Sequence, residues 1–310
     1  MIEIRGLVKR FGPVTAVDGL SFDVMPGRVT GFLGPNGAGK TTTMLMMLGL
    51  VRPGAGEVRI GGRRYRDLPV PLAEAGVLLE ARAFHGGRRA RDHLLFLAKS
   101  NRIPARRVGE VLALTGIEQA AGKRAKALSL GMAQRLGIAA ALLGDPAVLV
   151  LDEPLNGLDP EGIAWIRTLM RDLAAQGRTV LFSSHLISEV ALAADHLIVI
   201  GKGRLIADTS AAGLAASSGQ PVLVRSPRAG ELAGRLRHAG AATEPAEDGA
   251  IRVTGLDAAT IAGLAAAAGI AVHELTPQQP SLEEAFMKLT RDHAEFRAGP
   301  ASPGQAGPGE

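Results

Sequence analysis

A glycine-rich segment, GPNGAGKTT at residues 34–42, constrains the fold and chemistry of this chain more than any other feature. It fits the pattern G-x-x-x-x-G-K-[ST], a loop whose backbone N–H groups surround the phosphates of a nucleotide. Glycine permits this because it adopts positive φ and has no Cβ to keep the phosphate oxygens away. The apolar run before the loop predicts a buried strand, and the run after it predicts a helix whose dipole favours an anion.

The side chains of this loop have distinct expected tasks. We expect Lys40 to reach the β- and γ-phosphates and stabilise the transferring group, and Thr41 to place its hydroxyl on Mg²⁺. The other loop residues expected to contact the nucleotide are Gly34, Asn36, Gly37, Ala38, Gly39 and Thr42. The alternative is a glycine-rich turn that ends in Lys-Thr by chance, which the flanking strand and helix disfavour. Kinases, GTPases and motor ATPases all use such a loop, so other segments must decide the class.

The composition is that of a globular chain. Its 310 residues, 46% hydrophobic and 21% charged, indicate one or two domains with sizeable cores. The absence of cysteine excludes disulfides, thiol catalysis and Cys-ligated zinc. With one Trp and one Tyr the chain has few rings for stacking on single-stranded nucleic acid, and we expect no nucleic-acid partner. No apolar run reaches the ~20 residues of a spanning helix, and the N-terminus lacks a signal-peptide core, which predicts a cytoplasmic protein.

Residues 1–208 are expected to form one α/β unit of the P-loop NTPase class. Strands alternating with helical patterns predict a mixed, largely parallel core sheet with an antiparallel edge subdomain. The pattern from about residue 90 to 144 predicts a helical insert. The expected strands are an edge strand at Ile2–Ile4, then Val29–Leu33, Glu57–Ile60, Gly76–Leu79, Val148–Leu151 and Thr179–Ser183, and a hairpin turning at Gly201–Gly203.

The C-terminal part reads as a smaller α+β domain. Residues 209–220 are small and polar and predict a linker. Residues 221–292 show the order β-α-β-β-α-β of a ferredoxin-like domain. Ser281 and Glu284 have the capping-box spacing for the start of a closing helix. The Pro- and Gly-rich tail, residues 298–310, is predicted to be disordered.

Two adjacent acids follow an apolar strand in VLVLDEP, residues 148–154. We expect Asp152 to bind Mg²⁺ and Glu153 to polarise an attacking water. A buried carboxylate needs a partner, so two acids directly after four apolar residues are unusual on an ordinary core strand. The alternative is an acidic cap between strand and loop, and the phosphate loop favours the catalytic interpretation.

A second anion-binding helix start is predicted in LSLGMAQR, residues 128–135. Gly131 lies at the start of a helix and Ser129 directly precedes it. Because a P-loop protein already has one phosphate site, this second one suggests contact with the nucleotide of another subunit. For this segment alone, a capped helix N-terminus is the simpler interpretation.

Together, GPNGAGKTT, LSLGMAQR, LDEP, NGLDP and the single histidine of FSSHL occur in the order and spacing of the ATP-binding-cassette (ABC) ATPases, which the chain resembles over residues 2–208. The resemblance implies that Asp152 ligates Mg²⁺, that Glu153 is the general base and that His185 contacts the γ-phosphate. It further implies roles for Phe11 in stacking on adenine, Val17 beside the ribose and base, Ser129 and Gly131 at the γ-phosphate of the opposite subunit, and Asp159 in a loop that crosses between subunits. The alternatives are a core aromatic at Phe11 and a buried, hydrogen-bonded histidine at His185.

The chain departs from the family pattern at three positions. Glu80 stands where a glutamine is usual; its carboxylate can attract Mg²⁺ and accept a hydrogen bond from water but cannot donate one. We therefore count Glu80 among the nucleotide- and metal-contacting residues and expect it to tighten the dependence on Mg²⁺. Leu130 and Met132 stand where glycine and glutamine are commoner. These variants and the segment PSLEEAFMKLT resemble the subgroup associated with antibiotic self-resistance and export of the bacitracin and daunorubicin type.

The resemblance implies an ATP-hydrolysing subunit that uses ATP and Mg²⁺ to power an exporter of drugs, antibiotics or lipids. Two copies would close head to tail around two ATPs, and a separate transmembrane permease would hold them on the inner face of the membrane. The basic cluster Arg82, Arg88, Arg89 and Arg91 would dock there, or is a solvated face. One alternative is a soluble mechanochemical ATPase of this family acting on ribosomes or nucleic acid. Another is a small-molecule kinase, which the LSLGMAQR and LDEP motifs disfavour.

Overall fold

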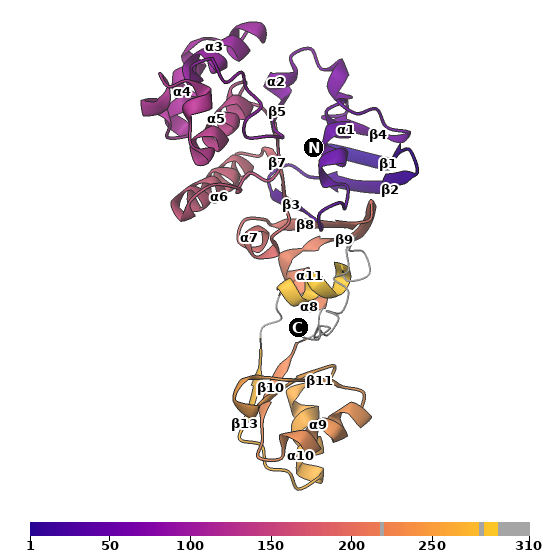
Figure 1. Ribbon diagram of the computed structural model, residues 1–310. Coiled ribbons are helices and arrows are strands. Elements are labelled where there is room, and N and C mark those ends of the chain that lie inside the picture. The colour runs from indigo at the N-terminus through magenta and orange to yellow at the C-terminus, as the bar shows by residue number, and fades with distance from the viewer. Residues whose placement is uncertain (218–219, 279–281, 291–310) are drawn as a thin grey trace, which may run out of the picture.

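The computed structural model describes residues 1–217, 220–278 and 282–290. A six-stranded sheet forms the centre of its N-terminal part, made of β3 (Val29–Leu33), β5 (Ala75–Leu78), β6 (Val148–Leu151), β7 (Thr179–Ser184), β8 (His196–Gly201) and β9 (Arg204–Ser210). The order is β5-β6-β7-β3-β8-β9. Figure 1 labels five of these strands, β5, β7, β3, β8 and β9, which follow one another in this order. Neighbours are parallel except in the β8–β9 hairpin, so the predicted mixed, largely parallel sheet is confirmed.

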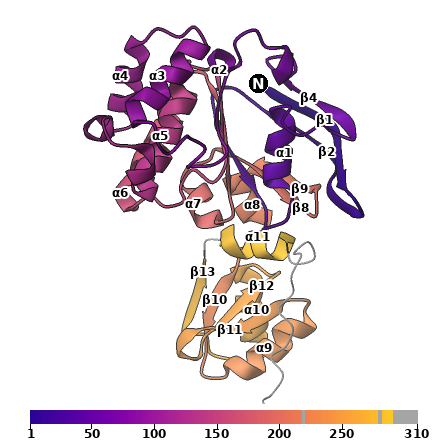
Figure 2. The same cartoon turned by 45° about the horizontal axis from the view of Figure 1, so that its top comes forward.

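Alternate side chains of this sheet enter two separate cores, because successive residues of a strand point to opposite faces. On one face, Val150 and Leu181 pack with α1 (Lys40–Met47) and with a second sheet. On the other face, Leu151 and Phe182 pack with the helices that follow later in the chain. Figure 2 shows α1 on one side of the sheet and α3, α4, α5 and α6 on the other.

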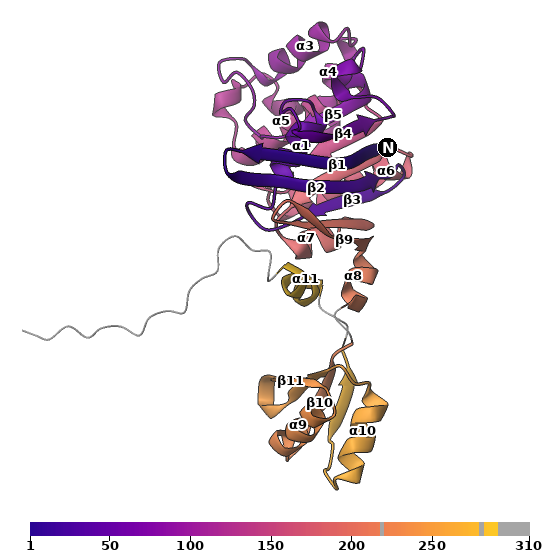
Figure 3. The same ribbon diagram turned by 90° about the vertical axis from the view of Figure 1, so that its right-hand side faces the viewer.

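The second sheet has three antiparallel strands, β1 (Ile2–Phe11), β2 (Val14–Val24) and β4 (Ala55–Ile60). Its order is β2-β1-β4 (Figure 3). The expectation that Ile2–Ile4 forms an edge strand is wrong, because β1 hydrogen-bonds to a partner on each side. The alternation of this segment has another cause: Ile2 and Ile4 point into the core, whereas Glu3 between them is only partly buried.

Helices cover both faces of the central sheet of the N-terminal part. The predicted insert at residues 90–144 contains three helices whose buried side chains include Leu94, Val111 and Leu136. These helices are α3 (Ala90–Ser100), α4 (Arg106–Leu114) and α5 (Leu130–Leu142), with 3-10 turns at Glu118–Ala120 and Ala125–Ala127. The others are α2 (Pro71–Glu74), α6 (Pro160–Ala175) and α7 (Ile187–Ala191), with a 3-10 turn at Tyr65–Asp67.

A separate antiparallel sheet follows in the C-terminal part. It contains β10 (Val222–Arg225), β11 (Ala242–Pro245), β12 (Ile251–Thr254) and β13 (Glu274–Pro277), and its helices are α9 (Ala229–His238) and α10 (Ala258–Ala267). The strand order is β11-β12-β10-β13, and a core around Val224, Leu232 and Ile261 joins the sheet to the two helices. The last strand begins at Glu274, and residues 270–273 run from the end of α10 to the sheet outside any strand.

The expected linker is largely structured. Residues 209–210 end β9, and α8 (Ala211–Ser217) follows, with Leu214 buried in the core of the N-terminal part. Alanine is the best helix former, so the small-residue composition that indicated a linker also suits a short helix. The described residues contain no helix with the length and apolar character needed to span a bilayer.

The chain returns to the N-terminal part through α11 (Leu282–Thr290). This helix packs against α7 and α8, and its Ala285 and Phe286 are buried in the same core (Figures 1 and 3). The helix expected after the ferredoxin-like pattern therefore belongs to the N-terminal part by its contacts. Ser281 of the predicted capping box and the tail at residues 298–310 lie outside the described residues.

Candidate nucleotide-binding site

The phosphate loop, residues 34–39, joins β3 to α1 and is packed too closely for larger side chains. Gly39 has φ 99°, a conformation that other residues rarely adopt. A Cβ at Gly39 would lie 2.4 Å from the carbonyl oxygen of Ala16, and one at Gly34 would lie 2.5 Å from that of Ile200. The two glycines thus let the loop rest against β2 and β8 and present bare backbone at the start of α1, which fits a phosphate group.

Lys40, the first residue of α1, is almost entirely buried. Its ammonium group donates a hydrogen bond to the carbonyl oxygen of Gly34 at 2.7 Å. Burial lowers the pKa of Lys40, and the carboxylates of Glu153 and Asp152 oppose that shift. A cation held in poor contact with water beside a glycine cradle can stabilise phosphate oxygens strongly, because little solvent has to be displaced from it.

Thr41 and Asp152 meet although 111 residues separate them in the chain. The Thr41 hydroxyl donates to Oδ2 of Asp152 at 2.8 Å, and the Ser183 hydroxyl donates to the other carboxylate oxygen. This places a hydroxyl and a carboxylate side by side, and hard oxygen donors of this kind suit Mg²⁺. Ser183 was not anticipated from the sequence; its only signal is its position at the end of β7, the strand beside the one that carries the two acids.

Glu153 is held in an uncommon backbone conformation with φ 47°. Its N–H donates to the Ser183 hydroxyl at 2.9 Å. Its carboxylate lies 3.0 Å from Nδ1 of His185 and 3.5 Å from Nδ2 of Asn156. The structure therefore brings two of the expected catalytic residues, Glu153 and His185, into direct contact. The expected contact of His185 with the γ-phosphate remains a prediction.

Three further expected residues lie around this centre. Glu80 is exposed two residues beyond β5, at the sheet edge where the N–H of Asp152 donates to the carbonyl of Leu78 at 2.7 Å. Phe11 ends β1 and is 50% exposed, which suits a ring that stacks on a ligand better than a core aromatic. Val17 is fully buried on β2. A Cβ at Gly39 would lie 3.4 Å from its Cγ2 atom, so the Val17 side chain packs next to the phosphate loop.

Ser129, Gly131 and Asp159 are not brought to the phosphate loop of their own chain. Ser129 caps α5, its hydroxyl accepting from the N–H of Met132 at 3.2 Å, and Asp159 caps α6, accepting from the N–H of Gly162 at 2.9 Å. Both helices pack on the face of the sheet opposite α1 (Figure 2). Within a single chain, Ser129 and Asp159 serve as helix caps, and Gly131 lies in the first turn of α5.

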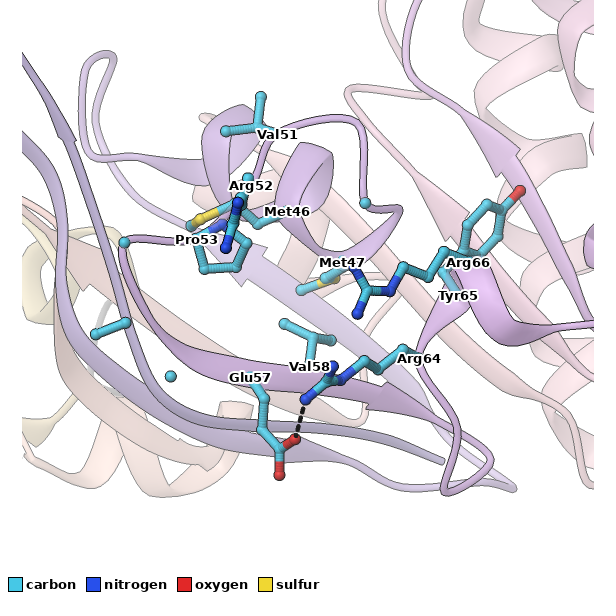
Figure 4. Close-up of a pocket in the computed structure, with 14 residues that line it drawn as sticks. Met46, Met47, Val51, Arg52, Pro53, Glu57, Val58, Arg64, Tyr65 and Arg66 are labelled. Atoms are coloured by element: carbon cyan, nitrogen blue, oxygen red, sulfur yellow. Dashed lines mark ion pairs between the residues drawn. The ribbon is translucent and has the colours of Figure 1, made fainter.

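A cavity of about 360 Å³ lies at the opposite end of α1 from the phosphate loop (Figure 4). Met46, Met47 and Val58 line it, and Arg64 reaches over it to Glu57 at 3.6 Å. Because it is at the C-terminal end of α1, it is separate from the site of the phosphate loop.

The arrangement of these groups defines a P-loop nucleoside triphosphatase, since the strand that follows the helical insert delivers its acids to the threonine and lysine of the loop. A family model described as "ABC transporter" matches residues 17–156, and a model for a domain of unknown function matches residues 220–283. Two curated relatives and one solved structure are similar to longer parts of the chain than the first of these models.

The bacitracin transport ATP-binding protein BcrA of Bacillus licheniformis is 41% identical over 209 residues, which cover 66% of this chain and 68% of the relative. The ABC transporter ATP-binding protein YdbJ of Bacillus subtilis, itself uncharacterized, is 33% identical over 300 residues, 95% of this chain and 97% of its own length. A dimeric ATP-binding cassette bound to ADP and phosphate has a TM-score of 0.62 at 23% identity over 68% of this chain and 98% of its own, which supports the fold. The chain belongs to the ATP-binding proteins of ABC transporters and is an ATPase that binds ATP.

Proposed function

We propose that this chain is the ATP-hydrolysing subunit of an exporter that removes an antibiotic or a related amphiphile from the cell. The observation that carries the hydrolytic part is the joint placement of Thr41, Asp152, Glu153 and His185 at the ends of neighbouring elements. The antibiotic is supported by the likeness to a bacitracin transport protein, and the outward direction by the likeness to a Nod factor export ATP-binding protein that is 39% identical. The ribosome- or nucleic-acid-acting alternative has no support from the relatives.

In the proposed chemistry, water attacks the γ-phosphate of ATP. Glu153 orients this water and accepts its proton, while Lys40 and the loop N–H groups stabilise charge on the transferring phosphoryl group. His185, which already contacts Glu153, holds the γ-phosphate. Thr41 and Asp152 would hold Mg²⁺, with Glu80 near the same sheet edge, and the ion would neutralise phosphate charge.

We further propose that two copies complete each site. Ser129 and Gly131 lie at the N-terminal end of α5, where a helix of 13 residues favours an anion, but on the wrong face of the sheet to reach their own phosphate loop. A second copy turned head to tail would bring them to the γ-phosphate, with Asp159 at the crossing loop. Sedimentation of Glu153→Gln should give a dimer with Mg-ATP and a monomer without it. A monomer under both conditions would contradict this part.

A separate transmembrane permease would supply the transport path and hold the chain on the inner face of the membrane. The strand order and antiparallel pairing of the C-terminal sheet fit a ferredoxin-like domain. We propose that residues 221–278 form this accessory domain, which follows the cassette of residues 1–208 in the sequence.

The test is a pull-down of tagged Glu153→Gln protein, loaded with Mg-ATP, from detergent-solubilised membranes of its host. Recovery of a multi-spanning membrane protein, absent when the tag alone is used, is the expected result. Recovery of only ribosomal or nucleic-acid components would contradict the transport function and leave the ATPase assignment intact.

A further inference from the structure

The turn after β6, residues 153–157, carries the hydrolytic carboxylate in a conformation that needs support. Glu153 has φ 47°, a region in which a residue with a Cβ persists only where its surroundings fix it. Its N–H is fixed by the Ser183 hydroxyl on β7. The other side of the turn is formed by the carbonyl oxygens of Glu153 and Pro154.

The other side is fixed by Gln134 of α5. Its side-chain Nε2 donates to the carbonyl oxygens of Pro154 at 2.9 Å and Glu153 at 3.3 Å. Gln134 is only 3% exposed, so its amide has no ready substitute partner in water. A primary amide has two N–H donors, and here one can serve each of the two carbonyls. A buried amide bound to two successive carbonyls holds the peptide plane between Glu153 and Pro154.

A second contact joins the same helix to the same turn. The Leu130 side chain lies over Gly157, where an added Cβ would be 2.3 Å from Cδ2 of Leu130. A Cβ at Gly131 would lie 3.2 Å from the carbonyl oxygen of Gly157, so the backbones also approach closely. Leu130, one of the departures from the family pattern, therefore fits a space that exists because residue 157 is glycine.

We propose that Gln134 is a positioning residue for Glu153, and that Leu130 assists it by packing on Gly157. Gln134 touches no substrate; it acts by setting where the Glu153 carboxylate points. This inference rests on the proposed role of Glu153 in hydrolysis. It also implies that a shift of the first turn of α5, the part expected to meet the second copy's nucleotide, is passed through these contacts to the carboxylate of its own chain.

The first test is steady-state ATPase kinetics of Gln134→Met, which keeps the length of the side chain and removes both donors. We expect kcat to fall at least tenfold while KM for Mg-ATP stays within about threefold, because binding is made by the phosphate loop. Gln119→Met is the matched control, since Gln119 is exposed in the same insert and should leave both constants unchanged. A parental kcat in Gln134→Met, with Glu153→Gln inactive, would overturn the proposal.

The second test is the pH profile of Gln134→Glu. A carboxyl at this buried position has its pKa raised, because burial disfavours the charged form. A protonated carboxyl has one O–H donor and an ionised one has none, so lowering the pH should restore part of the hydrogen bonding. We expect kcat of Gln134→Glu relative to the parent to rise as pH is lowered from 8 to 6, whereas kcat of Gln134→Met relative to the parent stays flat. Equal relative profiles for the two variants would show that the loss of volume or fit, and not the hydrogen bond, lowers the rate.

A double-mutant cycle covers the case in which Gln134→Met does not fold. Gly157→Ala should lower kcat because its Cβ displaces Leu130 and because alanine is strained at φ 77°, and Leu130→Gly in the same chain should recover the part of the loss that comes from the displaced leucine. No recovery would overturn the role of the Leu130–Gly157 contact. If the parent chain itself hydrolysed no ATP, or Glu153→Gln kept the parental rate, the proposed function would have failed instead.

Discussion

Gly39→Ala is the substitution whose consequences follow most directly from the geometry of the phosphate loop. An alanine there must adopt φ near 99°, which costs about 1–3 kcal/mol for a residue with a Cβ. Its Cβ would also lie 2.4 Å from the Ala16 carbonyl oxygen, inside the about 3.3 Å of a close C···O contact. The loop or β2 must therefore move by about 0.9 Å. Overpacking of this kind costs about 1–3 kcal/mol more.

Gly49→Ala is the matched control, because an alanine there has the backbone strain of a positive φ without the overpacking. Gly49 follows α1 with φ 68°, and a Cβ at this position meets nothing within 4 Å. Urea unfolding of both variants should therefore show a loss in both, with Gly39→Ala the less stable by the overpacking energy. We also expect Gly39→Ala to bind Mg-ATP about 100-fold more weakly in calorimetric titration, since a displacement near 1 Å misplaces the phosphate-binding groups. Equal stability of the two variants, with unchanged ATP affinity, would refute the reasoning.

Three further predictions concern two side chains of the site and one of the helical insert. Lys40→Met should weaken Mg-ATP binding by about 10- to 150-fold, the worth of charged hydrogen bonds to phosphate; unchanged calorimetric affinity would contradict its role. Phe11→Ala should lose about 1–3 kcal/mol of ATP affinity as a stacking surface and leave the unfolding midpoint unchanged, because the ring is half-exposed; a large fall in the midpoint would make it a core residue. Burial and the charge of Arg88 lower the pKa of His93 in the folded state. As the pH falls, the His93 imidazole is therefore protonated at a higher pH in the unfolded state than in the folded state. Stability should accordingly fall as pH drops through about 6.5, and His93→Leu should flatten that fall between pH 7.5 and 5.5 in thermal unfolding scans; identical slopes would refute it.

Much of the central fold could be predicted because its signals are local. The strands Val29–Leu33 and Val148–Leu151 have the expected bounds, since each is a short apolar run with polar or turn-forming neighbours. The position of β1 could not be inferred in the same way, because edge and central strands differ only in their partners. The sequence predicts a linker over residues 209–220, within which α8 forms, because alanine, glycine and serine serve both short helices and flexible segments.

In the candidate site, the residues of sequence motifs could be predicted, whereas the groups that support them could not. The residues of motifs, from Lys40 to His185, could be proposed from spacing, and the structure brings Thr41 to Asp152 and His185 to Glu153. The groups that support them could not be proposed from the sequence, because a serine at a strand end or a glutamine within a helix has no distinctive pattern. Ser183 and Gln134 acquire meaning only when β7 and α5 are placed beside the turn after β6. The proposed contribution of a second copy stays a prediction, because Ser129 and Gly131 lie on the face of the sheet opposite α1 in their own chain.

The most direct test of the account is phosphate release from Mg-ATP by the parent chain and by Glu153→Gln, measured at saturating ATP together with ATP binding. The account predicts that Glu153→Gln binds ATP with near-parental affinity and releases phosphate at least 100-fold more slowly, since an amide cannot accept the proton of the attacking water. Phosphate release at the parental rate would contradict the assignment of Glu153 and, with it, the proposed mechanism.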